Sequence, residues 1–364
     1  MCFRTLVTLL TLTIMASLPG RAQRLHLENE IRKIVRLDDD IDLNQGSCTV
    51  IGIIDGDSTY TYQWGTLEHQ SQSPVTDTSL FVAGGVSHAQ LILLTYHMMQ
   101  LGLINIDDSL GRFQFREFSG SRLNTFTIGS LLSHNTGLPA ILPELTHLKA
   151  DPDDDYKDYT ETAIDSALVV RTKESGPEGN RPFSHYNQYL LSKVLWAVKD
   201  KRVHDNGRMI PEMSHTWFLP LDALKAGSIP AHYTAQQRML SMPHFNALTP
   251  AMGMVTCMDD LVIMTKVLLR LSVQSDFQKT FLDARTTRTK KGIPLSKGGF
   301  RMIDGHKSGN IYFMTGLLKG ESAFLCFAPK THTAVIILHN AGVSQHILGH
   351  QIMRMINYQY TRTY

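Results

Sequence analysis

The chain has 364 residues, of which 43% are hydrophobic and 19% are charged, and its formal net charge at pH 7 is +2. This length is enough to bury a large core. The near-neutral charge argues against nucleic acid or an acidic lipid surface as the main partner, since both attract proteins with an excess of basic residues. No stretch of the sequence has the composition of a linker, so we predict one folded domain over residues 23–364.

The first 22 residues have the pattern of an export signal. A single charge, Arg4, precedes an apolar run from Leu6 to Leu18, and Gly20 and Ala22 supply the small residues that a signal peptidase recognises. The run is about 13 residues long, whereas a helix that spans a bilayer needs roughly 20. Cleavage would remove two of the 35 basic residues and leave equal numbers of basic and acidic ones. We therefore expect a secreted or periplasmic protein with no membrane span after signal removal; a retained membrane anchor is the alternative.

A helix and a hairpin are predicted next. Leu25–Leu37 has apolar residues at helical spacing, with charges on the opposite face. Cys48–Ile54 is an apolar run rich in β-branched residues, Asp55-Gly56 is a strong hairpin turn, and Tyr60–Trp64 alternates like a returning strand. The mature chain therefore begins with a helix and an antiparallel strand pair.

The middle of the chain is mostly helical. Val86–Leu103 is apolar on nearly all sides, which is typical of a helix buried in the interior, and Gly102 suits its C-terminal cap. Residues 120–290 have the patterns of helices and loops. The acidic run Asp151–Asp155 lacks the glycine and distal glutamate of a calcium-binding loop, so we interpret it as a solvated loop.

Strand patterns return near the C-terminus. Ala323–Phe327 and Thr333–Leu338 are apolar runs separated by Pro329-Lys330, and Ser344–Tyr358 has the spacing of an amphipathic helix. Strands at both ends of the chain predict one sheet built from both termini, with a helical region between them.

Cysteine and histidine spacing indicates no metal and no cofactor. Cys48, Cys257 and Cys326 remain after signal removal, an odd number without metal-ligand spacing, and the first and last lie in apolar runs as small buried hydrophobes. His346 and His350 are four residues apart on the last predicted helix. No third ligand is near them in sequence, so we interpret them as surface histidines.

Six segments, in matching order and spacing, resemble the penicillin-binding-protein and serine β-lactamase family, in particular its class C branch. The resemblance covers nearly all of residues 23–364 and implies a DD-peptidase/β-lactamase-like α+β fold. In such a fold an antiparallel sheet (about 23–82 and 295–364) is flanked by terminal helices and carries a large, mostly helical insertion (about 83–294). The six segments are Asp55–Gly65, Pro74–Phe81, Leu101–Asp108, Thr127–Pro139, Ala251–Leu261 and the closing strands that end at Leu338–Asn340.

The resemblance implies that the family's catalytic serine and lysine are replaced. The family's mechanism needs a serine at the start of the buried helix and a lysine three residues later, on the same helical face, to take up the hydroxyl proton. Gly85 occupies the serine position and His88 the lysine position. Glycine has no side chain, so no acyl-enzyme can form there. Ser87 points about 200° away from position 85 on a helix, which favours a packing role.

The family's second motif is a tyrosine, a small residue and an asparagine. Aligned without a gap on Leu190-Leu191, it falls on Phe183-Ser184-His185; shifted by two residues, it falls on His185-Tyr186-Asn187. We favour the first register because it needs no deletion. In either register the sequence departs from the family's pattern.

The family's third motif, Lys-Ser/Thr-Gly, lines the site from an inner strand. His306-Lys307-Ser308-Gly309 resembles this motif, which predicts that Lys307 lies opposite Gly85. His306 is an alternative matching residue, and an ordinary exposed turn is the alternative interpretation. Since the Gly85 amide would remain at a helix N-terminus, the resemblance implies a cleft that favours a carboxylate or a similar anion.

These replacements predict an exported family member that has lost the acyl-serine mechanism and binds a small anionic or peptide-like ligand or a partner. The alternative is a hydrolase or transferase that acts on an ester or peptide through His88, His185 and Lys307 as a general-base site. Loss of the nucleophile lowers turnover by about 10⁶ in a serine hydrolase of another fold, so we favour binding. The candidate binding residues are Gly85, His88, His185, Tyr186, Asn187, His306, Lys307, Ser308 and Gly309.

Overall fold

The computed structural model describes residues 24–36, 46–140, 142–148, 151–174, 183–198, 210–218, 229–288 and 293–360. Residues 1–43 and 44–364 form two compact units. In the first, a helix over residues 24–36 confirms the first predicted helix. The predicted signal peptide lies outside the described residues. Within the described ranges, no helix has the length and apolar character needed to cross a membrane.

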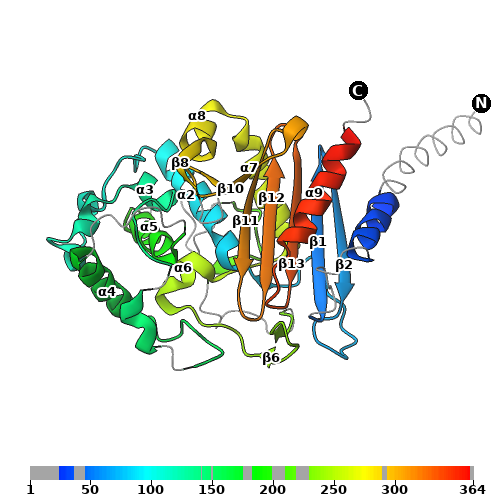
Figure 1. Ribbon diagram of the computed structural model, residues 1–364, viewed down its shortest axis with the longest axis horizontal. Coiled ribbons are helices and arrows are strands. Elements are labelled where there is room, and N and C mark those ends of the chain that lie inside the picture. Colours follow the sequence, from blue (N-terminus) through cyan, green and yellow to red (C-terminus); the bar gives the residue numbers. More distant parts are fainter. Residues whose placement is uncertain are drawn as a thin grey trace, which may run out of the picture. The chain divides into compact units, whose positions relative to one another are not determined.

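The second unit is built on an eight-stranded antiparallel sheet (Figure 1). Its strand order, β2-β1-β13-β12-β11-β10-β9-β8, places strands from both ends of the chain side by side and confirms the predicted arrangement. β1 pairs with β2 across the predicted Asp55-Gly56 turn and pairs with β13 on its other side. The strands are β1 Cys48–Asp55, β2 Ser58–Gly65, β8 Ala284–Arg288, β9 Pro294–Ser296, β10 Arg301–Asp304, β11 Asn310–Leu317, β12 Ser322–Ala328 and β13 Thr333–His339.

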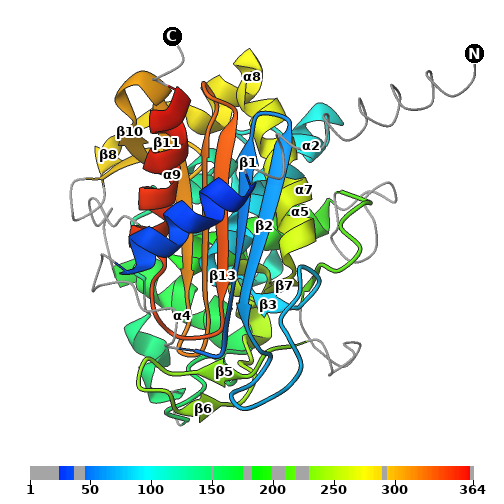
Figure 2. The ribbon, with the colours of Figure 1, turned by 90° about the vertical axis from the view of Figure 1, so that its right-hand side faces the viewer.

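Helices cover both faces of this sheet (Figure 2). α7 (Met258–Ser272) packs on one face against β1, β12 and β13, and α9 (His346–Tyr360) packs on the opposite face against β12 and β13. Every residue of β12 and β13 is consequently buried. This two-sided burial explains why both strands are continuous apolar runs rather than alternating ones.

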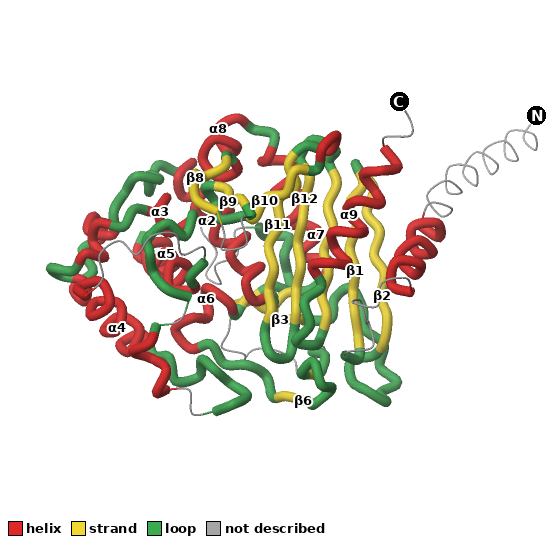
Figure 3. The backbone as a smooth tube through the Cα atoms, in the orientation of Figure 1, coloured by secondary structure: helices red, strands yellow, loops and turns green. Residues whose placement is uncertain are grey.

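A helical region lies beside the sheet and includes α2, the predicted buried helix (Figure 3). The 3₁₀ turn η1 (Gly84–Val86) leads into α2 (Ser87–Gln100), and Gly102 after it has the left-handed φ expected of a cap, +69°. The other helices are α3 Ile128–Leu132, α4 Glu161–Glu174, α5 His185–Ala197, α6 Thr249–Met252 and α8 Ser275–Phe277. The short strands are β3 Phe81–Val82, β4 Trp217–Phe218 and β7 Met254–Thr256 in one sheet, and β5 His232–Tyr233 and β6 Met239–Leu240 in another.

The structure also tests the expected burial of the cysteines and the expected boundary of the C-terminal part of the sheet. Cys48, Cys257 and Cys326 are buried and unbonded, as expected of small hydrophobes in a core. The C-terminal part of the sheet begins at β8, earlier than the predicted residue 295, because β8 and β9 extend the sheet beyond β10. The fold is the α+β arrangement that the resemblance implied.

Candidate functional site

Backbone atoms crowd Gly85, the residue that the sequence resemblance aligns with a catalytic serine. η1 leads the chain into α2, and β11 contacts η1. A Cβ atom on Gly85 would lie 2.5 Å from the Thr315 carbonyl oxygen, and a Cβ on Gly316 would overlap the Ala83 carbonyl oxygen. Gly84 has a φ of +52°, which residues with side chains rarely adopt. The two backbones are therefore in contact, and no room remains for a side chain at Gly85.

The predicted third motif lies elsewhere. His306–Ser308 forms a 3₁₀ turn, η10, between β10 and β11, and Lys307 is exposed there. Thr315 comes five positions after Asn310, the first residue of β11. In an extended strand this places their Cα atoms about 16 Å apart. The prediction that Lys307 lies opposite Gly85 is therefore wrong, and the alternative, an exposed turn, describes this segment.

The segment that faces Gly85 is Thr315-Gly316. The register of β11 is fixed by its pairing with β12, in which Thr315 lies opposite Phe324. Met314, the residue before Thr315, is buried in this strand.

His88 is buried, and its ring is fixed by the loop that precedes β10. Its Nε2 lies 2.9 Å from the Gly298 carbonyl oxygen. Because a carbonyl oxygen can only accept, this nitrogen carries the ring's proton and donates a hydrogen bond to the carbonyl. Burial lowers the pKa of His88 to about 4, which leaves the ring neutral at pH 7. A neutral ring whose Nε2 is engaged in this way does not replace the family's lysine as a base for residue 85.

Four rings form a column that starts at His88. The centroid separations are 5.0 Å from His88 to His134, 4.6 Å from His134 to Phe183 and 4.8 Å from Phe183 to His185. Phe183 and His185 are the outer residues of the first register of the tyrosine motif, so the structure groups this register with His88. Burial also lowers the pKa of His185 to about 4, so the histidines at both ends of the column are neutral at pH 7.

Three other candidate side chains are buried and hydrogen-bonded to neighbouring segments. Tyr186, Asn187 and Ser87 each have 2% exposure or less, and their contacts explain them as packing residues. The Tyr186 hydroxyl accepts the Leu142 N–H at 3.2 Å, Asn187 Oδ1 accepts the Thr136 hydroxyl at 2.6 Å, and Ser87 Oγ accepts the Met254 N–H at 3.4 Å.

A cavity of about 320 Å³ lies at the far end of the ring column, where His185 forms part of its wall. His185 is the one predicted binding residue that lines it. The rest of the wall comes from residues 153–156, from residues between 240 and 245, and from the turn between β11 and β12, together with His232 and Met252. The sequence did not single out these segments for binding, because they meet only in the folded chain.

The acidic run Asp151–Asp155 is a loop, as predicted, but its last three residues form part of this wall. Their carboxylates contact partners from distant segments, and Asp154 is only 6% exposed. Asp153 pairs with Arg238 at 2.6 Å, Asp154 contacts His244 Nδ1 at 2.7 Å, and Asp155 pairs with Lys319 at 2.9 Å. Cations that arrive from other parts of the chain explain why an acidic run is partly buried.

A buried histidine and glutamate, which the sequence analysis missed, also line the cavity. His232 Nδ1 lies 3.0 Å from Glu321 Oε1, and both side chains are almost fully buried. Burial raises the pKa of Glu321. Burial alone would lower the pKa of His232, but the nearby charge of Glu321 outweighs it and raises that pKa. The sequence signal was a lone glutamate directly before the apolar run Ala323–Phe327.

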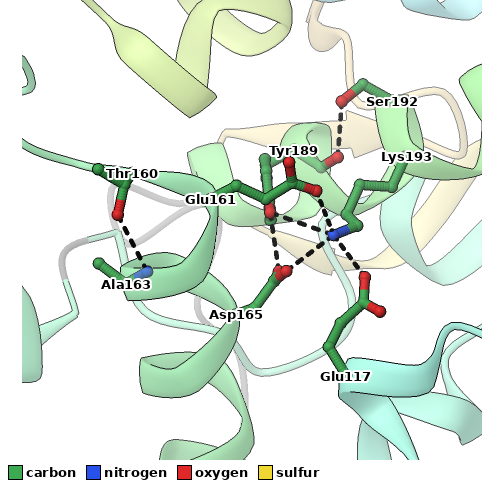
Figure 4. Close-up of polar contacts among 8 residues, drawn as sticks. All are labelled: Glu117, Thr160, Glu161, Ala163, Asp165, Tyr189, Ser192 and Lys193. Atoms are coloured by element: carbon green, nitrogen blue, oxygen red, sulfur yellow. Dashed lines mark hydrogen bonds and ion pairs between the residues drawn. The ribbon is translucent and has the colours of Figure 1, made fainter.

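A separate cluster of charges surrounds Lys193 (Figure 4). Its ammonium lies 2.7 Å from Glu117, 2.6 Å from Glu161 and 2.8 Å from Asp165, and the Tyr189 hydroxyl donates to Asp165 at 2.7 Å. Burial acts to lower the pKa of Lys193, but these acceptors raise it overall. The three carboxylates are close enough to hold a metal ion, but the ammonium already occupies the space between them.

Donor atoms of His215, Cys257 and Asp260 also lie within 4.8 Å of one another. Burial raises the pKa of the Cys257 thiol to about 12, so the thiol keeps its proton at neutral pH and is a poor metal ligand. Asp260 Oδ2 already accepts the His215 N–H at 2.8 Å and the Thr216 hydroxyl at 2.7 Å. These contacts account for the group as a structural one.

Comparisons with known proteins agree with the fold. The β-lactamase family profile matches residues 41–353. A β-lactamase from Providencia stuartii is 25% identical over 156 residues, which span 39% of this chain and only 39% of that relative. The segment shared with this curated relative is thus well under half of its length.

Solved structures share the architecture over most of the chain. A class C β-lactamase in complex with cefoxitin has a TM-score of 0.73 at 16% identity, covering 91% of this chain and 99% of that one. The octameric penicillin-binding protein homologue from Pyrococcus abyssi has a TM-score of 0.74 at 14% identity, covering 90% of this chain and 77% of that one. Identities this low support the fold, whereas the profile match over residues 41–353 establishes the family. The chain therefore belongs to the β-lactamase family.

Proposed function

We propose that this protein is an exported, non-catalytic member of the β-lactamase family that binds a small polar or peptide-like ligand in the cavity beside His185. The observation that carries the proposal is the contact at Gly85, where a Cβ atom would lie 2.5 Å from the Thr315 carbonyl oxygen. The family's mechanism needs a serine hydroxyl at this position. His88, which the sequence resemblance aligns with the family's lysine, is buried and neutral at pH 7.

The geometry does not favour the alternative, a hydrolase or transferase that uses His88, His185 and Lys307. Lys307 lies in the exposed η10 turn, and the Nε2 of His88 is engaged with Gly298. The two histidines belong to one ring column, but Phe183 and His134 lie between them. No general-base site is assembled from these three residues.

The cavity wall also changes the expected ligand. The expectation of an anion depended on Lys307, which does not line the cavity, whereas each carboxylate of the wall is paired with a basic or imidazole side chain. The cavity volume of about 320 Å³ falls at the lower end of the range of small-molecule sites, roughly 300–1,000 Å³. A small polar ligand therefore suits the wall, and no unpaired lysine favours an anion.

Acylation tests the loss of the family's chemistry. The purified mature chain is incubated with a fluorescent penicillin and examined by intact-mass spectrometry, beside an active class C β-lactamase. We expect no mass increase on this chain, because no nucleophile stands at position 85. A covalent adduct on any of its serines would overturn the proposal.

A serine at position 85 tests whether crowding by the Thr315 carbonyl oxygen prevents acylation. We expect Gly85→Ser to remain unacylated, because its Cβ would clash with the Thr315 carbonyl oxygen. The double variant Gly85→Ser/His88→Lys is the matched comparison; we expect it to remain unacylated as well, since it restores the serine and the lysine of the first motif but not the space. Rapid acylation of Gly85→Ser alone would show that β11 yields easily and that only the side chain is missing.

Export is tested separately. Expression of the full chain in a bacterial host, followed by N-terminal sequencing of the fraction outside the cytoplasm, should give a mature protein that begins at residue 23. Recovery of an uncleaved chain in the membrane fraction would favour the retained anchor instead.

A further inference from the structure

Two histidines lie one turn apart on α9, the helix that ends the described part of the chain. His346 is its first residue and His350 follows four residues later, so the two side chains lie on the same helical face. Their ring centroids are 6.4 Å apart. His346 is exposed, as expected from the sequence, but His350 is half-buried. The interpretation of both as surface histidines therefore holds for His346 only.

The ring of His350 is held in place by aromatic rings of the sheet. Its centroid lies 4.6 Å from that of Phe313 on β11 and 5.1 Å from that of Phe324 on β12, and its plane is nearly perpendicular to both. These contacts fix the ring without using its nitrogens. Within the described ranges neither nitrogen of His350 makes a hydrogen bond, and neither is among the fully buried polar atoms that lack a partner. Packing therefore positions this imidazole while its nitrogens remain accessible to solvent.

Each of the two rings has a nitrogen lone pair to offer. Burial, together with the neighbouring His346, lowers the pKa of His350 to about 4, so this ring is neutral at pH 7. The Nδ1 of His346 lies 2.9 Å from the Ser344 hydroxyl. When Nδ1 carries the ring's proton, the hydroxyl accepts a hydrogen bond from it and Nε2 keeps the lone pair. A partner that sets the tautomer in this way is typical of histidines that bind metal ions.

We propose that His346 and His350 together bind one divalent transition-metal ion of the class of Cu²⁺, Ni²⁺ and Zn²⁺, with water or a small ligand completing its coordination. Imidazole nitrogen suits these ions, and histidines at positions i and i+4 of a helix can share one ion. Metal–nitrogen distances of about 2.1 Å bring the two rings closer than their present separation. The exposed His346 side chain supplies this movement, because the ring of His350 is fixed by Phe313 and Phe324.

Titration of the untagged, metal-free mature chain tests this site. Dissociation constants for CuCl₂, NiCl₂, ZnCl₂ and MgCl₂ are measured at neutral pH by isothermal titration calorimetry. We expect one transition-metal ion per chain, with Cu²⁺ bound most tightly, and no binding of Mg²⁺, which prefers oxygen ligands. The electron paramagnetic resonance spectrum of the Cu²⁺ complex should show coupling to imidazole nitrogen. Since the ion binds the folded helix, saturating Zn²⁺ should also raise the melting temperature.

Substitutions then locate the ion. His346→Ala removes an exposed imidazole, and His350→Phe keeps an aromatic ring against Phe313 and Phe324 but offers no nitrogen. We expect each variant to weaken Cu²⁺ and Zn²⁺ binding at least tenfold and to lose the rise in melting temperature. His147→Ala is the matched control, since His147 is an exposed histidine in the 3₁₀ turn Pro143–Leu148, without a second histidine one turn away. Thermal melting of each metal-free variant confirms that it is folded.

The outcomes separate this inference from the proposed function. No binding of any of the three transition-metal ions at millimolar concentration overturns the site. Binding that is as tight in His346→Ala or in His350→Phe as in the unmodified chain overturns it as well, because the ion would then be held elsewhere. A penicillin adduct, in contrast, overturns the non-catalytic function and is independent of the metal titrations.

Discussion

The charges around Lys193 and those around Glu321 are built from similar groups, yet they differ in burial and in how they are paired. The Lys193 ammonium is 10% exposed and lies within 2.8 Å of three carboxylates, of which Asp165 is 9% exposed and Glu161 is 65% exposed. Glu321 is 1% exposed; one of its oxygens accepts the Val82 N–H, and the other lies 3.0 Å from His232 Nδ1. The first cluster shares one cation among three acids near the surface, whereas the second is a single buried pair in the wall of a cavity. The two clusters therefore differ in how much of their charge is shielded from water.

Breaking the Lys193 cluster should have the largest effect. Lys193→Met leaves Asp165, the buried carboxylate of the three, without its cation, while Glu117 and Glu161 are partly or largely exposed. The free energy of unfolding, measured in urea, should fall by about 3 kcal/mol, the low end of the cost of breaking a buried pair. Lys193→Arg is the control that keeps the charge. A loss below about 1 kcal/mol would mean that the carboxylates simply take up protons.

Acid should destabilise the folded protein through His88, the buried histidine at the start of the ring column. The pKa of His88 is about 4 in the folded protein and about 6.5 when unfolded, so the unfolded state binds more protons between these values. The stability contributed by neutral His88 is therefore complete above pH 6.5 and is lost as the pH falls toward 4. For His88 alone this is about 2 kcal/mol between pH 7 and pH 5. His88→Gln, which can still donate to Gly298, should reduce that loss; an identical pH dependence in both proteins would contradict a buried neutral histidine.

Neutralising Glu321 should change stability much less than breaking the Lys193 cluster. In Glu321→Gln the side-chain oxygen still accepts the Val82 N–H, and the burial that raises the pKa of Glu321 no longer opposes a charge. We expect the free energy of unfolding to change by less than about 1 kcal/mol in either direction. A drop above about 2 kcal/mol would place Glu321 with Lys193 as a structural charge.

Lys307→Ala should have the smallest effect of all. Lys307 is exposed in the η10 turn, and substitutions at such positions usually change stability by less than about 0.5 kcal/mol. The melting temperature should match that of the unmodified chain. A fall in the free energy of unfolding above about 1 kcal/mol would show that Lys307 makes a stabilising contact.

The sequence by itself determined the elements that depend on local patterns. The β1–β2 hairpin follows from an Asp-Gly turn between strand-like runs, and the two-sided burial of β12 and β13 follows from their continuous apolar runs. The replacement at Gly85 was also readable, because the position is tied to the start of a recognisable buried helix. Periodicity and turn chemistry act over a few residues, so the chain alone specifies them.

Only the tertiary structure decided what surrounds Gly85 and where a ligand fits. A tripeptide match favoured Lys307, but the pairing of β11 with β12 sets the register and brings Thr315 to Gly85 instead. The cavity likewise combines residues 153–156 with His232 and Glu321, which no sequence spacing relates. Strand register and long-range ion pairs are settled by the whole fold at once, because each depends on hydrogen bonds between segments that are far apart in the chain. For this reason the sequence predicted a replacement at Gly85, while only the folded chain shows the backbone contact between Gly85 and Thr315.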